Sequence, residues 1–401
     1  MRYLSIFSKH FWPENFKINE IALKLKKKFR VNVYTSQPGY NNQKYKTNLK
    51  NKKLNGINIT YFSSFKKKNE SFFSIFLNYI SYVINLTVKI NFFLKRESDV
   101  CFTYATSPVF QSIPAIYYSK IKKVPNVIWV QDLWPEVLED TGYVKNKFLL
   151  NLVDRLVNII YQNSDLILAQ SESFEKHLKK KYKLKNKVFT LYQPSDYSFQ
   201  KYNFKKSKYF YITYAGNFGK SQDFNTILNA FKSNQINENI KLNLIGSGKK
   251  FNYLKNEINK NKLNSKIILS SFKNKNKINK ILKASSAFFI TLNNGKSLNK
   301  TIPGKFQTYI CYGKPILICS YSELNNFIVK NSIGLASKPN DTKKLVYNIN
   351  RVFNMRKNQK KKIYLSSKKI YEQLFEINKV TKKLETYLYM AKTKYAKKNL
   401  L

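Results

Sequence analysis

Short apolar runs alternate with longer amphipathic segments along nearly the whole chain, and this alternation restricts the fold more than any other feature. In the first half, the runs cover residues 3–7, 31–34, 57–61, 100–104, 127–130, 166–169 and 188–190. In the second half, they cover residues 209–214, 240–245, 267–269, 287–291, 316–319 and 334–336. Because strands buried on both faces read as continuous apolar runs, the pattern predicts an α/β chain with parallel sheets covered by helices.

The length of 401 residues predicts two domains, since single hydrophobic cores stop growing well below that size. Residues 193–207 are polar, lysine-rich and free of strand pattern, so we interpret them as the linker between the domains. Residues 1–7 form too short an apolar run for a signal peptide, and we interpret them as containing the first strand. Beyond about Lys357 the chain is lysine-rich and helical in pattern.

The charge of the chain is strongly unbalanced. Lys and Arg number 73 against 22 Asp and Glu, a formal charge of +51. Such a charge favours an anionic partner, which is nucleic acid, anionic lipid headgroups or a phosphorylated substrate. Compositional bias is an equal alternative, because Lys, Asn, Ile, Phe and Tyr are all over-used together. The basic residues are scattered and accompany no recognisable nucleic-acid reader, which favours a cytoplasmic membrane surface over nucleic acid.

Cysteine and histidine usage limits the chemistry. Cys101, Cys311 and Cys319 lack metal-ligand spacing and indicate a reducing compartment. His10 and His177 are the only two histidines, which argues against a His-based metal site or a Ser-His-Asp triad. The sequence contains no Asp-x-Asp triplet, so Lys, Arg and backbone N–H groups would have to stabilise an anionic leaving group.

The segment 301–319 predicts an anion site in the second half. Pro303 and Gly304 mark a loop, a short helix follows from about Lys305, and Gly-Lys-Pro separates that helix from the next strand. The ammonium groups of Lys300 and Lys305 and the free N–H groups of the helix N-terminus all favour a phosphate there.

A second phosphate-favouring loop follows the run 209–214. Gly216, Gly219 and Lys220 lie in this loop, and glycines let the backbone approach a phosphate closely. For the two glycines alone, an ordinary turn is an equal alternative. Taken together with Lys305, they favour the phosphate interpretation.

Acidic and aromatic residues follow strands of the first half. Asp132 lies just past a buried run, where ligand groups gather in open α/β sheets. We interpret it as the acid–base residue, with N-capping of the following helix as the alternative. Glu14 is a second candidate, with a solvated loop acid as its alternative, and Glu136 is interpreted as a first-turn helix residue. Trp12 and Trp134 are candidates for stacking on a ligand ring or for core packing.

Four segments, in order along the chain, resemble one family. They are 11–19 (FWPENFKIN), 129–136 (WVQDLWPE), 214–223 (YAGNFGKSQD) and 301–315. Together they look like the WbuB-like branch of the family 4 GT-B glycosyltransferases, which builds bacterial cell-surface polysaccharides. The segments Gln-Asp-Leu-Trp-Pro-Glu and Ala-Gly-Asn-x-Gly-x-x-x-Asp carry most of the resemblance, whereas Gly-Lys-Pro alone is weak.

The resemblance implies two Rossmann-like parallel-sheet domains facing a cleft. The acceptor-side domain is expected over residues 1–195, the nucleotide-sugar-binding domain over 208–375, and a helix returning to the first domain over 376–401. The implied activity is retaining, metal-independent transfer of a hexosyl or N-acetylaminosugar unit. The donor is expected to be UDP-linked, and the acceptor an isoprenoid-diphosphate-linked or growing saccharide of O-antigen or capsule.

The same resemblance implies where the enzyme works and what it requires. No metal or other cofactor is expected beyond the nucleotide-sugar donor. An anionic membrane surface is expected as a partner, so the protein is placed in the cytoplasm, peripheral at the inner face of the plasma membrane. Two other functions stay open, a basic nucleic-acid-binding protein and a nucleotide-sugar 2-epimerase of the same fold.

Two features depart from the broader family. Its Glu-x7-Glu pair, whose second Glu binds the ribose, is replaced here by Lys300 and Thr308. Its usual Gly-Arg near the start of the second domain reads Gly216-Asn217. The resemblance therefore implies that the Thr308 hydroxyl stands in for the carboxylate and that Lys305 replaces the guanidinium.

The segment 71–94 is long and apolar enough to resemble a membrane span. Asn78, Asn85, Lys89 and Asn91 argue against a span. Basic residues lie at both ends of the segment, at 66–68 and 95–96. We interpret it as an interfacial or groove-forming helix, with a plain core helix as the alternative.

Overall fold

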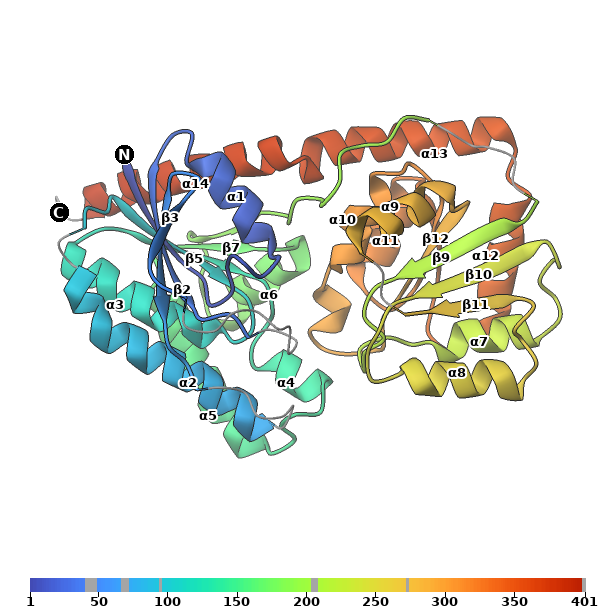
Figure 1. The fold of residues 1–401 in the computed structure, drawn as a ribbon, viewed down its shortest axis with the longest axis horizontal. Coiled ribbons are helices and arrows are strands. Elements are labelled where there is room, and N and C mark those ends of the chain that lie inside the picture. Colours follow the sequence, from blue (N-terminus) through green and yellow to red (C-terminus); the bar gives the residue numbers. More distant parts are fainter. Residues whose placement is uncertain (40–48, 66–71, 94–95, 203–207, 272–273, 399–401) are drawn as a thin grey trace. The chain divides into compact units, whose positions relative to one another are not determined.

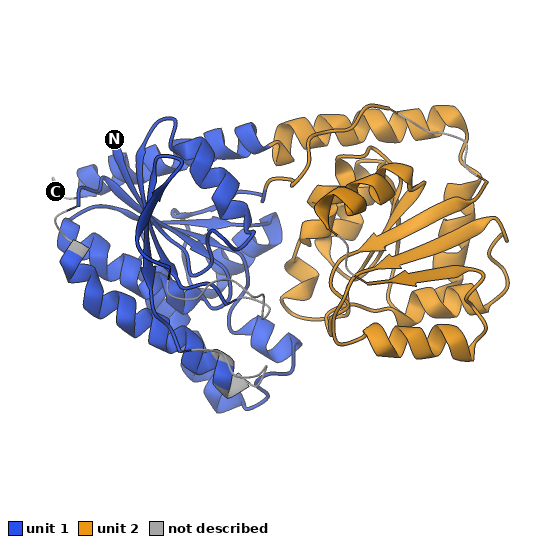
Figure 2. Cartoon of the chain, in the orientation of Figure 1, with its two compact units in different colours: residues 1–193, 377–401 blue, residues 194–376 orange. Residues whose placement is uncertain are grey.

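The computed structural model describes residues 1–39, 49–65, 72–93, 96–202, 208–271 and 274–398. The chain forms two compact units, residues 1–193 with 377–401 and residues 194–376 (Figure 2). The described part of the expected linker, from residue 194, belongs to the second unit, because Ser195 N–H donates to the Phe375 carbonyl and the Ser195 hydroxyl contacts Cys311.

Unit 1 is built on an eight-stranded sheet with the order β3-β4-β2-β1-β5-β6-β7-β8 (Figure 1). All neighbouring strands are parallel except β3 and β4. The strands are β1 (Tyr3–Phe7), β2 (Arg30–Ser36), β3 (Lys52–Leu54), β4 (Ile57–Phe62), β5 (Val100–Ala105), β6 (Asn126–Val130), β7 (Leu166–Ala169) and β8 (Val188–Thr190). The strand order reverses between β1 and β5, and ligands of open α/β sheets bind outside the carboxyl ends of the strands at such a point.

Helices cover both faces of this sheet. Leu4 and Ile6 of β1 point to the face covered by α1 and α14, whereas Phe7 points to the face covered by α2 and α3. The helices of unit 1 are α1 (Lys17–Leu25), α2 (Phe72–Lys89), η2 (Ile90–Phe93), η3 (Val109–Ser112), α3 (Ile113–Lys122), α4 (Glu136–Asp140), α5 (Lys147–Gln162), α6 (Glu172–Lys181) and α14 (Ile377–Lys398). Because α14 packs on β5 and α1, the chain's C-terminal helix belongs to the first unit.

Unit 2 contains a six-stranded parallel sheet with the order β11-β10-β9-β12-β13-β14. Its strands are β9 (Phe210–Ala215), β10 (Ile240–Ile245), β11 (Ile267–Ser270), β12 (Ala287–Thr291), β13 (Ile316–Cys319) and β14 (Gly334–Ser337). Its helices are α7 (Asn225–Lys232), α8 (Phe251–Lys260), α9 (Lys275–Ala284), η4 (Leu298–Lys300), α10 (Gly304–Ile310), α11 (Glu323–Lys330), α12 (Thr342–Phe353), α13 (Lys357–Ile370) and the π-helical turn η5 (Tyr371–Phe375). Here the strand order reverses between β9 and β12.

Within the segment 71–94, the described residues 72–93 form α2 and η2. Tyr82, Leu86 and Ile90 are fully buried in the core of unit 1, as the core-helix alternative requires. The amide side chains of α2 serve the same unit: Asn78 donates to the Phe65 carbonyl at 2.5 Å and Asn85 donates to the Ser63 carbonyl at 2.7 Å. Within the described residues, no helix combines the length and the apolar character needed to cross a bilayer.

Candidate functional sites

In unit 2, two loops meet at the carboxyl ends of β9 and β10. Gly216 N–H donates to the Ile245 carbonyl at 2.9 Å, and Phe218 N–H donates to the Ser247 carbonyl at 2.8 Å. A Cβ atom on Gly246 would lie 1.8 Å from the Gly216 carbonyl oxygen, and one on Gly248 would lie 2.7 Å from the Phe218 carbonyl oxygen. Glycine is therefore required at both positions after β10, because any side chain would collide with backbone.

The sequence interpretation missed Gly246 and Gly248, although the signal is present. The run 240–245 is followed at once by Gly-Ser-Gly, the same strand-to-glycine pattern as at Gly216. Gly248 has φ +138° and Gly216 has φ +147°, which L side chains rarely adopt. The glycines at 246 and 248 thus let the two loops pack closely against each other at the carboxyl edge of the sheet, and glycine-rich loops of this kind can bind a phosphate.

Lys305 lies against this glycine-rich edge. A Cβ atom on Gly216 would be 2.5 Å from Lys305 Cε, so the lysine side chain passes directly over the glycine. Its Nζ lies 4.8 Å from the ring centroid of Tyr214, and burial lowers the Lys305 pKa to about 8. Among the described residues, no carboxylate forms an ion pair with Lys305 and no acceptor forms a hydrogen bond with its Nζ. A partly buried cation without an internal anion is suited to binding an anionic ligand.

The other predicted residues after β9 lie in the same loop. Asn217 is exposed, and its Nδ2 would be 2.9 Å from a Cβ atom on Gly219. Gly219 N–H donates to Gln222 Oε1 at 2.9 Å. Lys220 is exposed, and its carbonyl accepts a hydrogen bond from Asn293 Nδ2 at 2.5 Å. The side-chain amides of Gln222 and Asn293 therefore hold the loop, while the Lys220 side chain is exposed to solvent.

The predicted residues around α10 are more dispersed. Gly304 opens α10 and is exposed, and the nearest atom to a Cβ built there is 3.9 Å away. Lys300 Nζ donates to the Lys296 carbonyl at 2.5 Å. Thr308 Oγ1 lies 3.5 Å from Asp196 Oδ2, at the outer limit of a hydrogen bond. Of this group, Lys305 is the residue that the structure brings to Gly216.

In unit 1, Asp132 follows β6 and is held by a neighbouring loop. Ser107 Oγ donates to Asp132 Oδ2 at 2.8 Å, and Trp134 Nε1 donates to Ser107 Oγ at 3.1 Å. Burial raises the Asp132 pKa, and the hydrogen bonds from Ser107 oppose this shift. The N-cap residue of α4 is Pro135, and α4 has no side-chain capping bond. The capping alternative for Asp132 is therefore wrong.

Glu14 lies in the loop after β1 and is 3% exposed, which excludes the solvated-acid alternative. Its Oε2 is 2.9 Å from His10 Nδ1, and its Oε1 accepts from Gly39 N–H at 2.7 Å. Trp12 is 37% exposed, and Lys52 Nζ lies 3.5 Å from its ring centroid. Of the two predicted aromatic residues, Trp12 is thus available at the surface, while Trp134 is tied to the Asp132 loop.

Sequence reasoning missed Lys9, which lies in the same loop just after β1. It is 3% exposed, and its Nζ lies 4.6 Å from the Tyr79 ring centroid and 5.0 Å from that of Tyr82. Burial lowers the Lys9 pKa to about 7, and the nearby Glu14 carboxylate opposes the shift. In a chain with 73 basic residues, no sequence signal separates this buried lysine from the exposed ones.

Glu136 opens α4, as expected, but it is buried and multiply bonded. Its Oε1 lies 2.8 Å from His177 Nε2 and 2.7 Å from Lys181 Nζ. Burial would raise the Glu136 pKa, but the bonds from His177 and Lys181 outweigh burial and lower it to about 2. Tyr182 OH donates to the Trp134 carbonyl at 3.3 Å. The contacts of His177 and Lys181 in α6, and of Tyr182 just after it, hold the loop that carries Asp132.

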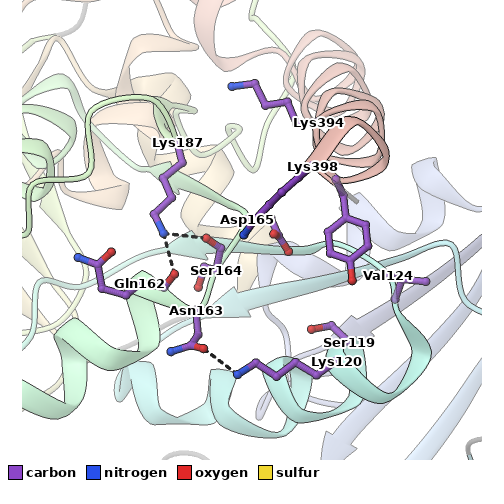
Figure 3. A pocket seen from close by; sticks show the side chains of 11 residues that line it. Ser119, Lys120, Val124, Gln162, Asn163, Ser164, Asp165, Lys187, Lys394 and Lys398 are labelled. Atoms are coloured by element: carbon purple, nitrogen blue, oxygen red, sulfur yellow. Dashed lines mark hydrogen bonds between the residues drawn. The ribbon is translucent and has the colours of Figure 1, made fainter. Parts of the chain in front are cut away.

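A pocket of about 390 Å³ lies near the amino ends of β7 and β8 in unit 1 (Figure 3). Its lining includes Asp165 and Lys187, which precede β7 and β8, and Lys394 and Lys398 of α14. Lys187 Nζ donates to the carbonyls of Gln162 and Ser164 at 2.9 and 3.0 Å. The pocket contains none of the predicted site residues and lies away from the carboxyl ends of the strands.

No group of three or more His, Cys, Asp or Glu side chains within the described residues could hold a metal ion. At the carboxyl edge of β9 and β10, the positively charged group that lies against the glycine loop is Lys305.

Comparisons with known proteins bear on the fold and on the family pattern of the second unit. Residues 195–369 match the family model for glycosyl transferases group 1, and this match lies entirely within unit 2. No curated protein sequence matches the chain significantly. Several hundred solved structures match it in fold.

Three of these structures illustrate the likeness. The E. coli trehalose-6-phosphate structure bound with UDP-2-fluoro glucose has a TM-score of 0.72 at 10% identity, covering 96% of this chain and 98% of that one. Anabaena HepE in complex with UDP has a TM-score of 0.66 at 13% identity, covering 97% and 100%. WaaG, a glycosyltransferase involved in lipopolysaccharide biosynthesis, has a TM-score of 0.62 at 11% identity, covering 96% and 98%.

The chain therefore has the GT-B fold of two Rossmann-like units, with its terminal helix packed on the first. Its second unit carries the sequence pattern of the glycosyl transferases group 1. At 10–13% identity the structural matches show the fold alone, so the reaction and its residues have to be argued from the sites themselves.

Proposed function

We propose that the protein is a retaining, metal-independent glycosyltransferase that moves a sugar from a UDP-linked donor to a lipid-linked or growing saccharide of a cell-surface polysaccharide. The observation that carries the proposal is that Lys305 lies across Gly216, beside the glycine loop after β10, and forms no ion pair or hydrogen bond with the residues that the structure describes. This edge offers a cation beside two glycine-containing loops, a combination that suits a diphosphate. Transfer releases that diphosphate, and preorganised positive groups stabilise its developing charge.

The donor is proposed to occupy the carboxyl edge of β9 and β10. Lys305 takes the place of the arginine usual in the broader family, and Lys300 and Lys220 are the next cations along the chain. The Thr308 hydroxyl is the candidate ribose contact. HepE binds UDP and the E. coli structure binds a UDP-sugar, which supports UDP as the nucleotide here.

The acceptor is proposed to meet unit 1. Asp132 is the acid–base candidate, because its carboxylate is partly buried, its pKa is raised by burial, and Ser107 fixes its orientation. Glu14 is proposed as the second catalytic candidate, in the loop after β1, where His10 Nδ1 and the Gly39 N–H contact its carboxylate. Since WaaG takes part in lipopolysaccharide biosynthesis, a saccharide acceptor of O-antigen or capsule type fits the resemblance.

An acceptor attached to an isoprenoid diphosphate stays in the bilayer, so the proposed enzyme works at the inner face of the plasma membrane. Two observations support a peripheral position. The described residues contain no membrane-spanning helix, and α2 presents apolar side chains on its outer side, among them Ile84, Val88 and, in η2, Phe92.

Calorimetric titration with UDP tests the donor site. We expect UDP to bind the wild-type protein without added metal, and Lys305→Ala to weaken binding by ~1.5–3 kcal/mol, the usual value of a charge-assisted contact. Lys330→Ala is the matched control, since Lys330 is an exposed lysine of α11 in the same unit and removes the same charge. If both variants lose affinity for UDP equally, the loss is due to the overall charge of the protein, and the proposed donor site is wrong.

A further inference from the structure

Helix α5 is amphipathic, and its apolar outer side is left uncovered. Val157, Ile160 and Tyr161 are fully buried against the sheet of unit 1. On the outer side, five large apolar side chains are exposed, which we call the α5 stripe: Phe148 75%, Leu149 46%, Leu152 56%, Leu156 38% and Ile159 56%. Positions 148, 152, 156 and 159 recur at helical spacing, so they line one face. Single exposed apolar residues need no explanation, whereas a stripe of five on one helix indicates a binding surface.

The α5 stripe belongs to a larger helical layer. Because successive side chains of a strand point to opposite faces, Cys101 and Ala105 of β5 lie on the same face of the sheet. Cys101 packs with α2 and α3, and Ala105 packs with α5. The three helices therefore cover one face of the sheet (Figure 1). On α2, η2 and α3 the exposed large apolar residues are Phe76, Ile84, Val88, Phe92, Tyr117 and Ile121.

The charges on this layer determine which partner fits it. Lys147 and Arg155 lie on α5, and its one acidic residue, Asp154, forms an ion pair with Lys181 at 2.7 Å and accepts a hydrogen bond from Tyr182 OH at 2.5 Å. An apolar stripe with basic neighbours is complementary to an anionic lipid surface. A second copy of the chain is a poorer partner, because each copy carries a formal charge of +51 and the same basic groups would face one another.

We propose that the α5 stripe is the surface by which unit 1 inserts into the headgroup–acyl boundary of an anionic bilayer. This inference rests on the proposed function, because an enzyme with a lipid-linked acceptor has to work at that depth. The α5 side chains would enter the interface, while Lys147 and Arg155 meet the lipid phosphates. Helix α2 and η2 then contribute their outer side to the same surface and keep their inner side in the core.

Vesicle flotation tests the proposal with the full-length protein and vesicles of phosphatidylcholine with 30% phosphatidylglycerol. The double variant Phe148→Ser/Leu152→Ser should partition at least ~30-fold more weakly, since each such side chain is worth roughly tenfold when buried. The matched control is Val329→Ser/Leu365→Ser in unit 2, where both side chains are 53% exposed. If the α5 variant floats like the wild type, or the control loses as much, the stripe is not the docking surface.

A second measurement does not depend on a loss of binding. In Phe148→Trp, we expect the added tryptophan to shift to shorter emission wavelength and to be quenched by brominated acyl chains, relative to the wild type. Binding should weaken at high salt but persist, because apolar insertion is not screened. An unshifted, unquenched tryptophan on bound protein would overturn the proposal, as would a dimer that the α5 double variant converts to monomer.

Failure of this inference can be separated from failure of the proposed function. The α5 double variant should bind UDP with wild-type affinity in solution, because the stripe and the donor site lie on different units. If the wild-type protein binds UDP normally but does not dock on vesicles, the proposed membrane surface is wrong and the proposed transferase function stands. If the protein docks on vesicles but binds no nucleotide, the proposed transferase function is wrong and the membrane surface stands.

Discussion

The strongest prediction concerns how pH changes the affinity for UDP. Burial lowers the Lys305 pKa to about 8, so the lysine is roughly nine-tenths charged at pH 7 and one-tenth charged at pH 9. If the ammonium form binds the diphosphate, the apparent affinity should fall about tenfold across this interval, or roughly 1.3 kcal/mol. The direction follows from the depressed pKa: charge on Lys305 is lost as pH rises through 8, well before an exposed lysine would titrate.

The assay is calorimetric titration of UDP at pH 7, 8 and 9 at constant ionic strength. At pH 8, binding should also take up about half a proton per UDP, which buffers of different ionisation enthalpy reveal. Lys305→Arg is the control, because a guanidinium stays charged throughout. This variant should show no tenfold fall. A flat profile in the wild-type protein, or an equal fall in Lys305→Arg, would refute the assignment of Lys305 to the diphosphate.

Three further predictions concern the metal, the acid–base residue and the glycine edge. Activity should persist in excess EDTA, and a loss that magnesium or manganese restores would contradict the metal-independent mechanism. Asp132→Asn should lower turnover by ~10²–10⁴-fold with UDP affinity nearly retained, and near-normal turnover in the folded variant would remove Asp132 from the chemistry. Gly246→Ala places a Cβ 1.8 Å from the Gly216 carbonyl oxygen, so thermal melting should show a destabilised protein with impaired UDP binding. Gly304→Ala, whose Cβ meets nothing nearer than 3.9 Å, should melt like the wild type.

The parts of the fold that could be predicted are those with one dominant physical cause. Strands buried under helices on both faces must be apolar throughout, and this made thirteen of the fourteen described strands, all except β3, readable as short runs. The short edge strand β3 escaped prediction, because Lys52 and Lys53 suit an exposed edge and carry no apolar pattern. Domain boundaries were less predictable, because they depend on tertiary contacts such as Ser195 with Phe375.

In the candidate sites, too, the features with a local cause could be predicted and those set by distant packing could not. Gly216 with Lys305 could be predicted, because a glycine after a buried strand and a lysine beside a helix start both favour anions locally. The burial of Lys9 could not, since its cause is the packing of Tyr79 and Tyr82, which lie about 70 residues away in sequence. The bond between Glu136 and His177 spans 41 residues and is likewise set by the fold.

The central claim is sugar transfer from a nucleotide donor held at the carboxyl edge of β9 and β10. The most direct test is to incubate the protein in EDTA with a panel of nucleotide sugars and to follow donor loss and nucleotide release by NMR. The account predicts that at least one UDP-sugar is consumed with release of UDP, that the anomeric configuration is retained in the product, and that Lys305→Ala slows this reaction while Lys330→Ala does not. A folded protein that consumes none of the donors and binds no UDP would contradict it.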